Sequence, residues 1–211
     1  MAKKILISAG PTREKIDLVR FISNFSSGKM GYAIAKAAQK SGYQVTLVSG
    51  PVNLPAPDGV ELIKVESAAE MAAAILPRAN EFDVIIMTAA VADFRPKQIF
   101  QGKIKKGGKK LTIELEPTTD ILFELGKQKS PGQILIGFAA ENDNLIEYAK
   151  EKLTRKNLDF IAANIVDGSR SIGFSSDDNK IILVPANRTP IDLGFGSKEL
   201  LAQKLLEACG L

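Results

Sequence analysis

Apolar and polar positions divide the chain into short apolar runs and longer stretches with helical spacing of apolar residues. A continuous short apolar run is typical of a strand buried on both faces of a parallel sheet. Residues 83–90 form such a run and predict a buried strand, and short, largely apolar segments predict further strands at residues 4–9, 44–49, 60–65, 134–139 and 160–165. The helical spacing predicts helices at residues 30–41, 68–80, 120–129, 144–156 and 197–209. Strands alternating with helices build βαβ units, so the pattern predicts an α/β fold, Rossmann-like, with a mostly parallel sheet covered by helices on both faces.

Two segments depart from this alternation. Residues 94–110 are irregular and basic, and apolar alternation at residues 111–115 predicts a strand beyond them, so we interpret residues 94–116 as a basic flap. Short apolar runs at residues 181–184 and 191–193 predict a small C-terminal strand pair. Because no internal repeat or linker interrupts the pattern, we expect residues 1–211 to form a single domain.

Composition excludes several kinds of chemistry. The 211 residues include no histidine and one cysteine, Cys209, so neither a Cys-His dyad nor a Cys/His metal site is possible. A single cysteine fits a reducing cytoplasm, and neither a signal peptide nor an apolar run of roughly 20 residues is present, so we expect no membrane partner. The net charge of +4 fits anionic ligands, but aromatic residues are only 6%. Small phosphorylated ligands are therefore favoured over nucleic acid.

The segment that opens the helix at residues 30–41 is a candidate phosphate site. Ser26, Ser27, Gly28 and Lys29 precede this helix, where exposed backbone N–H groups and the positive helix end attract anions. The ordinary G-x-G-x-x-G turn is missing. The alternative interpretation is a simply capped helix in which Gly31 allows close packing against the first strand.

The end of the strand at residues 83–90 is a second candidate. Small residues, Ala89 and Ala90, let a ligand approach the backbone closely, and Asp93 could hold a hydrated magnesium ion or a ribose hydroxyl. The alternative is a solvated turn formed by Asp93 and Arg95. The carboxyl ends of parallel strands are where ligands bind in such sheets.

Lysines supply two further signals. The run at residues 103–110 could close over a triphosphate as a flap, or it could be a solvated hairpin. Tyr148, Lys152 and Lys156 share one stripe of a predicted helix, and Tyr148 with Lys152 matches the catalytic pair of short-chain dehydrogenases. An NAD(P)-dependent reductase is thus an alternative, disfavoured because no acidic residue follows the second strand and the glycine fingerprint is absent.

Taken together, the chain resembles the phosphopantothenate–cysteine ligase family, of the bacterial CTP-dependent type. The matching stretches follow the family's order over nearly the whole chain: residues 8–14 (SAGPTRE), 19–24 (VRFISN), 26–31 (SSGKMG), 89–95 (AAVADFR), 103–106 (KIKK), 137–141 (GFAAE) and 155–159 (RKNLD). It departs from the family's pattern at four flanking positions: Lys15, Leu18, Phe25 and Thr119. No decarboxylase domain accompanies these stretches, so we expect either a free-standing ligase or a domain of a fused protein.

The resemblance implies a two-step ligase of coenzyme A biosynthesis. The carboxylate of 4′-phosphopantothenate attacks the α-phosphate of CTP, with Mg²⁺, to give an acyl-cytidylate and pyrophosphate. The amine of L-cysteine then displaces CMP. The resemblance also implies a homodimer, with the flap and residues 165–195 as candidate contacts. A non-catalytic nucleotide-binding protein is the remaining alternative.

The resemblance assigns roles to individual residues. Lys103 would stabilise charge in the cytidylyl transfer, and Asn24 would act when cysteine attacks. Arg20, Asn24, Ala89 and Ala90 would bind the phosphopantothenate substrate, with Arg20 on its phosphate, possibly from the neighbouring subunit. The nucleotide would contact Ser26, Ser27, Gly28, Lys29, Ala89, Asp93, Lys103, Asp120, Ile121, Phe138, Lys152 and Lys156. Asp93 is also the candidate metal ligand.

Overall fold

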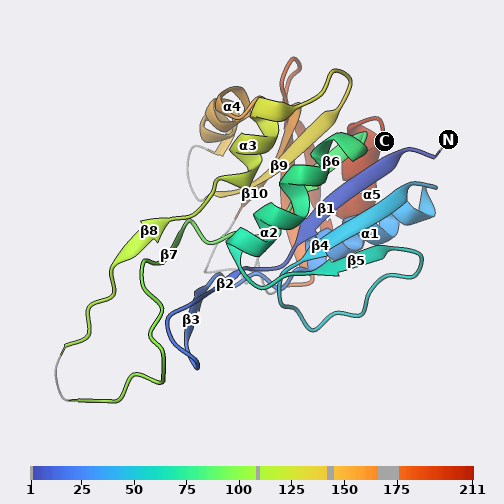
Figure 1. Ribbon diagram of the computed structural model, residues 1–211. Coiled ribbons are helices and arrows are strands. Elements are labelled where there is room, and N and C mark those ends of the chain that lie inside the picture. The colour runs from blue at the N-terminus through green and yellow to red at the C-terminus, as the bar shows by residue number, and fades with distance from the viewer. Residues whose placement is uncertain (1, 108–109, 142–144, 166–175) are drawn as a thin grey trace.

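The computed structural model describes residues 2–107, 110–141, 145–165 and 176–211. Within them, eight strands form one sheet in the order β12-β11-β10-β9-β6-β1-β4-β5 (Figure 1). These strands are β1 (Lys4–Ala9), β4 (Gln44–Ser49), β5 (Glu61–Lys64), β6 (Val84–Met87), β9 (Ile134–Glu141), β10 (Phe160–Ile165), β11 (Asp178–Pro185) and β12 (Ile191–Ser197). The predicted fold class is confirmed.

The strand order reverses between β1 and β6. From β1 the chain continues to β4 and β5 on one side, and later crosses to β6, β9 and β10 on the other. All these strands are parallel, and only β11 and β12 add antiparallel pairings at the end. The point between β1 and β6 is therefore a topological switch point, at which ligands bind in open α/β sheets.

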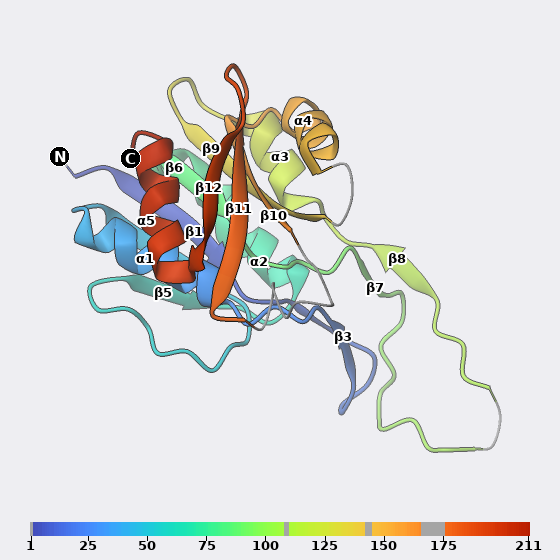
Figure 2. The same ribbon diagram turned by 180° about the vertical axis from the view of Figure 1, so that it is seen from behind.

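Helices cover both faces of the sheet, because the apolar residues of the central strands point alternately to each side. Ile5 and Ile7 pack under α1 (Lys29–Lys40) and α5 (Lys198–Ala208), whereas Leu6 packs on the opposite face. That opposite face carries α2 (Ala68–Ile75), α3 (Ile121–Gln128) and α4 (Leu145–Arg155). Figures 1 and 2 show the two helical layers from opposite sides.

Two predicted elements end several residues before their predicted bounds. The helix predicted over residues 68–80 ends at Ile75, and a 3₁₀ helix, η1 (Leu76–Glu81), follows it. Pro77 lies in this segment and has no N–H for an α-helical bond, so the chain tightens there. The strand predicted over residues 83–90 ends at Met87, because the backbone of Ala90 bonds to the loop after β1.

Two small antiparallel pairs lie outside the main sheet. β2 (Arg13–Lys15) and β3 (Phe21–Ser23) form a hairpin that the sequence did not predict, and β7 (Phe94–Pro96) pairs with β8 (Leu115–Pro117). We call residues 94–117 the arm; it projects from the carboxyl edge of the sheet beside β3 (Figures 1 and 2). The strand predicted at residues 111–115 is wrong except at Leu115, because this alternation is not packed on anything that would fix a strand: Leu111 and Leu115 are both exposed.

The C-terminal strands are longer than the predicted runs, since β11 and β12 pair over most of their lengths. Residues 166–175, which belong to the predicted dimer segment, lie outside the described residues. None of the helices in the described ranges combines the length and the apolar character that a membrane span needs.

Candidate functional site

Two loops meet at the switch point, one after β1 and one after β6. The backbone N–H of Ala90 donates to the carbonyl of Gly10 at 2.9 Å, and that of Thr12 donates to the carbonyl of Ala90 at 3.3 Å. The hydroxyl oxygen of Thr12 accepts a further bond from Ala92 N–H at 2.9 Å. The loop that carries Ala89 and Ala90 is therefore fixed against the end of β1.

Close packing of α1 completes one wall. A Cβ atom built on Gly31 would lie 2.5 Å from Thr88 Oγ1 and 2.6 Å from the Cβ of Ala9, so only glycine lets the helix approach this near. Gly28, which precedes α1, has φ +76°, a conformation that favours glycine. Among the described residues no side chain caps the helix at Gly28. Close packing and an anion-binding helix end are thus compatible at this segment.

A cavity of about 160 Å³ opens between the start of α1 and the ends of the strands. Its size fits a phosphate group with its neighbours rather than a whole nucleotide. The predicted residues that line it are Ser26, Ser27, Gly28, Lys29, Ala89, Ala90 and Phe138. The structure therefore brings together all four residues of the candidate phosphate site, both alanines and the aromatic residue of β9.

Asn24 reaches the same place from the end of the β2–β3 hairpin. Its side-chain Nδ2 donates to the carbonyl oxygens of Ala90 at 3.0 Å and Val91 at 3.3 Å. These two bonds fix the orientation of the amide group at the loop that lines the cavity. The side-chain oxygen of Asn24, on the other end of the amide, is then the group that can accept a bond from a ligand.

Three further lining residues escaped the sequence analysis: Asn164, Asn179 and Lys198, which are 8%, 4% and 6% exposed. Because β11 runs antiparallel, its first residues lie at the carboxyl edge of the parallel strands, and α5 begins at that edge after β12. The signal in the sequence was a polar residue inside or beside an apolar strand run, which the strand-end rule alone does not select.

Charge in the cavity is partly compensated by the protein. Lys29 Nζ lies 2.5 Å from the Asp177 carboxylate, and this contact lowers the pKa of Asp177. Burial lowers the pKa of Lys198, and repulsion from Lys29 adds to the effect. Lys198 Nζ donates to the carbonyl of Ser176 at 2.5 Å. Two ammonium groups at one cavity favour an anionic ligand.

A second group of predicted residues gathers around the start of α3. Lys156 Nζ is 2.7 Å from the carboxylate of Asp120, and Asp120 also caps α3 by accepting from Phe123 N–H. The backbone of Asp93 is connected to the segment that precedes α3, because its carbonyl accepts a hydrogen bond from Thr118 N–H at 2.9 Å. None of these residues lines the cavity described above.

The remaining predicted contacts in this region differ in accessibility. Ile121 is 3% exposed in the core, so only its backbone could meet a ligand. Tyr148 is 47% exposed on α4, and Lys152 is half-buried on the same helix. α4 packs on the sheet face opposite α1, and the residues of this stripe do not line the cavity.

Arg20 and Lys103 belong to the hairpin and the arm. The Arg20 guanidinium pairs with Asp17 at 2.7 Å and donates to the carbonyl of Ile104 at 2.7 Å, so it connects the two segments. Lys103, next to Ile104, is exposed on the arm and is not part of the cavity wall. Asp17 was not singled out by the sequence analysis.

Metal and thiol chemistry are constrained by the same geometry. Within the described ranges, no three acidic, histidine or cysteine side chains gather in a way that could hold a metal ion. Asp93 is exposed and can offer one carboxylate. Burial raises the pKa of the Cys209 thiol to about 12, so it is not a nucleophile near neutral pH.

Comparison with known proteins gives a consistent result. The family model of the DNA/pantothenate metabolism flavoprotein C-terminal domain matches residues 1–210. The Coenzyme A biosynthesis bifunctional protein CoaBC of Bacillus subtilis (strain 168) is 51% identical over 182 residues, which are 86% of this chain and 44% of that protein. The protein of the same name from Vibrio parahaemolyticus serotype O3:K6 (strain RIMD 2210633) is 48% identical over 207 residues, 97% of this chain and 51% of that protein.

A crystal structure of the C-terminal domain of Coenzyme A biosynthesis bifunctional protein CoaBC has the same fold. It matches with a TM-score of 0.83 and 45% identity, and the match covers 98% of this chain and 93% of that chain. The chain spans about half the length of the curated relatives that it matches.

Proposed function

Because the chain belongs to the family of the DNA/pantothenate metabolism flavoprotein C-terminal domain, we propose that it is a phosphopantothenate–cysteine ligase of coenzyme A biosynthesis. The observation that carries the proposal is the cavity at the switch point, where the start of α1, two lysines and the Asn24-bound loop converge. The relatives named for coenzyme A biosynthesis, at 48% and 51% identity, support the same assignment.

The proposed reaction has two steps. In the first, a carboxylate oxygen of 4′-phosphopantothenate bonds to the α-phosphorus of CTP, and the bond to the β-phosphate oxygen breaks to release pyrophosphate. In the second, the amine of L-cysteine bonds to the acyl carbon of the acyl-cytidylate, CMP leaves with the bonding electron pair, and the amine loses a proton. Both steps need anionic reactants to be aligned and their charge stabilised, which lysines and backbone N–H groups supply without histidine.

In this proposal, each group of residues at the cavity has its own role in binding or catalysis. Ser26, Ser27, Gly28 and Lys29 hold phosphate oxygens at the start of α1. Ala89 and Ala90 allow the acyl part of the substrate close to the backbone, and Asn24 holds the intermediate for the attack by cysteine. Lys103 comes from the arm to the charge that develops at the transferred phosphorus.

The nucleotide extends from the cavity toward the cluster at α3. Phe138 offers its ring at the cavity, while Asp120, Lys152, Lys156 and the backbone of Ile121 lie on the other side of the strand ends. Binding would then compete with the Asp120–Lys156 ion pair for one of its partners. This arrangement accommodates a ligand longer than the cavity itself.

Magnesium enters with the triphosphate in this proposal. The described residues provide no cluster of three metal ligands, which fits an ion held mainly by phosphate oxygens and water with one carboxylate, Asp93. When bound, the ion would neutralise charge on the phosphates. We expect the reaction to take place in the cytoplasm, where a lone buried cysteine stays reduced.

We also infer a homodimer. Several apolar side chains are exposed on the hairpin and the arm, where a second copy could cover them: Leu18, Val19, Phe25, Ile99 and Leu111. The edge strand β12, with Phe195 57% exposed, is the other candidate surface. The mass in solution by light scattering tests the inference, and a monomer at micromolar concentration contradicts it.

The experiment that tests the function measures pyrophosphate release with 4′-phosphopantothenate and magnesium, comparing CTP with ATP, before and after L-cysteine is added. We expect release with CTP, followed by CMP and the amide product only when cysteine is present. CTP binding without release would indicate a non-catalytic nucleotide-binding protein. Folded protein that releases pyrophosphate with neither nucleotide contradicts the proposal, and binding of NADPH would then favour the reductase.

A further inference from the structure

Asp17 is a buried carboxylate with an unusual set of partners. Its side chain is fully buried in the turn of the β2–β3 hairpin. Oδ1 accepts from the backbone N–H groups of Val19 and Arg20, both at 2.8 Å. Oδ2 accepts from Arg20 Nε at 3.0 Å and from the backbone N–H of Ile104 at 3.0 Å. A hairpin turn needs only the local bonds, so the bond to Ile104 calls for a separate explanation.

Among the described residues, that bond is one of three that join the hairpin to the arm. Arg20 Nη2 donates to the carbonyl of Ile104 at 2.7 Å, so both polar backbone groups of Ile104 are held by the Asp17–Arg20 pair. Phe100 N–H donates to the carbonyl of Ile16 at 3.0 Å. Asp17 and Arg20 thus form a clamp on the residue that follows Lys103.

The clamp is strong because the carboxylate stays charged. Burial alone would raise the pKa of Asp17, but the hydrogen bonds from Ile104, Val19 and Arg20 outweigh burial and hold the pKa well below its usual range. Hydrogen bonds to an ionised acceptor are roughly twice as strong as neutral ones. By contrast, the ion pair between Lys97 and Glu114 on the arm is exposed and contributes little.

We propose that Asp17 is a positioning residue for the first step of the reaction: by holding the backbone of Ile104, it fixes the arm so that Lys103 is presented to the α-phosphate of CTP. The inference rests on the proposed function, because Lys103 has its role only there. Asp17 itself touches neither substrate. Its effect on the rate passes through the position of Lys103.

The first variant is Asp17→Asn. The amide keeps the shape but loses the charge, and its NH₂ group cannot accept the bonds that one carboxylate oxygen now accepts. We expect the rate of pyrophosphate release to fall on the order of a hundredfold, as for other small misplacements of a catalytic group. The reaction of preformed acyl-cytidylate with cysteine should fall much less.

Limited proteolysis tests the clamp in the absence of substrates. Trypsin cleaves after lysine, and Lys103, Lys105 and Lys106 flank the clamped residue. We expect faster cleavage at these sites in Asp17→Asn, while the melting temperature shows whether the body is still folded. The matched control is Glu114→Gln, which removes an exposed carboxylate of the same arm and should change neither cleavage nor rate.

A double-mutant cycle separates positioning through Lys103 from other effects of Asp17. In a Lys103→Gln background, Asp17→Asn should lower the rate of pyrophosphate release little further. Should Asp17→Asn fail to fold, Ile104→Pro removes the N–H donor on the arm, and Ile104→Ala is its control because alanine keeps the N–H. We expect the proline variant, but not the alanine variant, to reproduce the loss of rate and the faster cleavage after Lys105 and Lys106, since trypsin does not cleave between lysine and proline.

Wild-type rates or unchanged cleavage in the folded Asp17→Asn protein overturn the proposal. So does an equally large loss in the Lys103→Gln background, because Asp17 then acts independently of Lys103. If the wild-type protein releases no pyrophosphate, the proposed ligase function fails, whereas the cleavage comparison still reports whether Asp17 clamps the arm. The two failures are therefore distinguishable.

Discussion

The body of the sheet and the arm are held by different forces. In the body, Ile5, Leu6 and Ile7 are fully buried in successive positions of one strand, because helices cover both faces. In the arm, Ile99 and Leu111 are 53% and 51% exposed, and the chain is fixed by a three-residue strand pair and the bonds at Ile104. Packing thus determines the body, whereas a few polar contacts determine where the arm lies.

This difference matches a division of work in the proposed reaction. The cavity is rigid because Gly31 and the bonded loops after β1 and β6 leave it little freedom. The arm carries Lys103 on a segment with little packing of its own, which can admit and release substrates at low cost. Changes to the packed body should therefore lower stability, and changes to the arm that remove or displace Lys103 should lower the rate.

The largest effect on stability is expected for Ile5→Ala. Ile5 is fully buried at the amino-terminal end of β1, away from the switch point. Loss of its side chain leaves a cavity, and we expect the free energy of unfolding to fall by about 2–5 kcal/mol. Denaturant unfolding measures this. The rate of pyrophosphate release per folded molecule should stay unchanged, and a large fall in that rate would break the comparison between body and arm.

For Lys103→Gln we expect a loss of rate with little loss of stability. Glutamine removes a charge that the proposed transition state needs, so we expect pyrophosphate release to slow by about 10²–10³-fold. Because Lys103 is exposed on the arm, the melting temperature should change little. Quenched-flow measurement of the first turnover checks the rate. Unchanged release would identify the lysine run as a solvated hairpin.

The body could be predicted from the sequence because burial leaves a pattern. The predicted bounds of β1 and β4 agree with the structure, since each is a short, largely apolar segment that ends at a Gly-Pro pair, Gly10-Pro11 and Gly50-Pro51. The β8 prediction failed because Leu111 and Leu115 alternate without a packed face, so their spacing carries no information on pairing. The β2–β3 hairpin was missed because its three-residue strands are too short to show a period.

The site was predictable where it is local and unpredictable where it depends on topology. Ser26 to Lys29 are adjacent in sequence and open a helix, so their grouping could be read directly. Asn164 lies near the carboxyl end of β10, but Asn179 and Lys198 reach the cavity only because β11 turns back along β10. Asp17 contacts a residue 87 positions away, and nothing in the sequence around it indicates that partner.

Asn24→Asp tests the contact between the end of the β2–β3 hairpin and the loop after β6. The carboxylate cannot donate to the carbonyls of Ala90 and Val91, and it would repel them. We expect pyrophosphate release to persist while amide formation slows by about tenfold or more, as for the loss of a well-oriented polar contact. Trapping the acyl-cytidylate by acid quench measures its accumulation. Amide formation at the normal rate would contradict the role given to Asn24.

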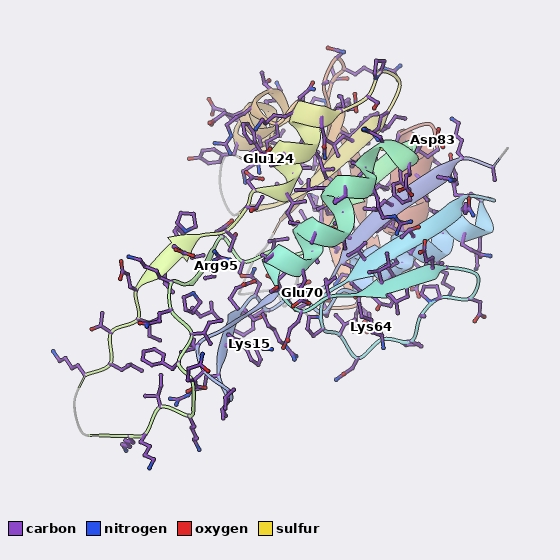
Figure 3. All side chains as sticks on the ribbon, in the orientation of Figure 1. Lys15, Lys64, Glu70, Asp83, Arg95 and Glu124 are labelled. Atoms are coloured by element: carbon purple, nitrogen blue, oxygen red, sulfur yellow. The ribbon has the colours of Figure 1, made fainter. Side chains whose placement is uncertain are left out.

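The smallest effect is expected at the base of the arm, for Glu116→Gln. Glu116 on β8 pairs with Arg95 on β7 at 2.8 Å, and Figure 3 shows Arg95 at the start of the arm. Both side chains are more than a third exposed, so solvent screens the pair and we expect the free energy of unfolding to change by less than about 1 kcal/mol. Equilibrium unfolding at low and high salt measures how much this ion pair contributes to stability. Glu114→Gln, which removes the exposed ion pair with Lys97, serves as the comparison. A loss as large as that of Ile5→Ala would contradict the comparison, because an exposed ion pair within the arm would then stabilise the protein as much as packing in the body does.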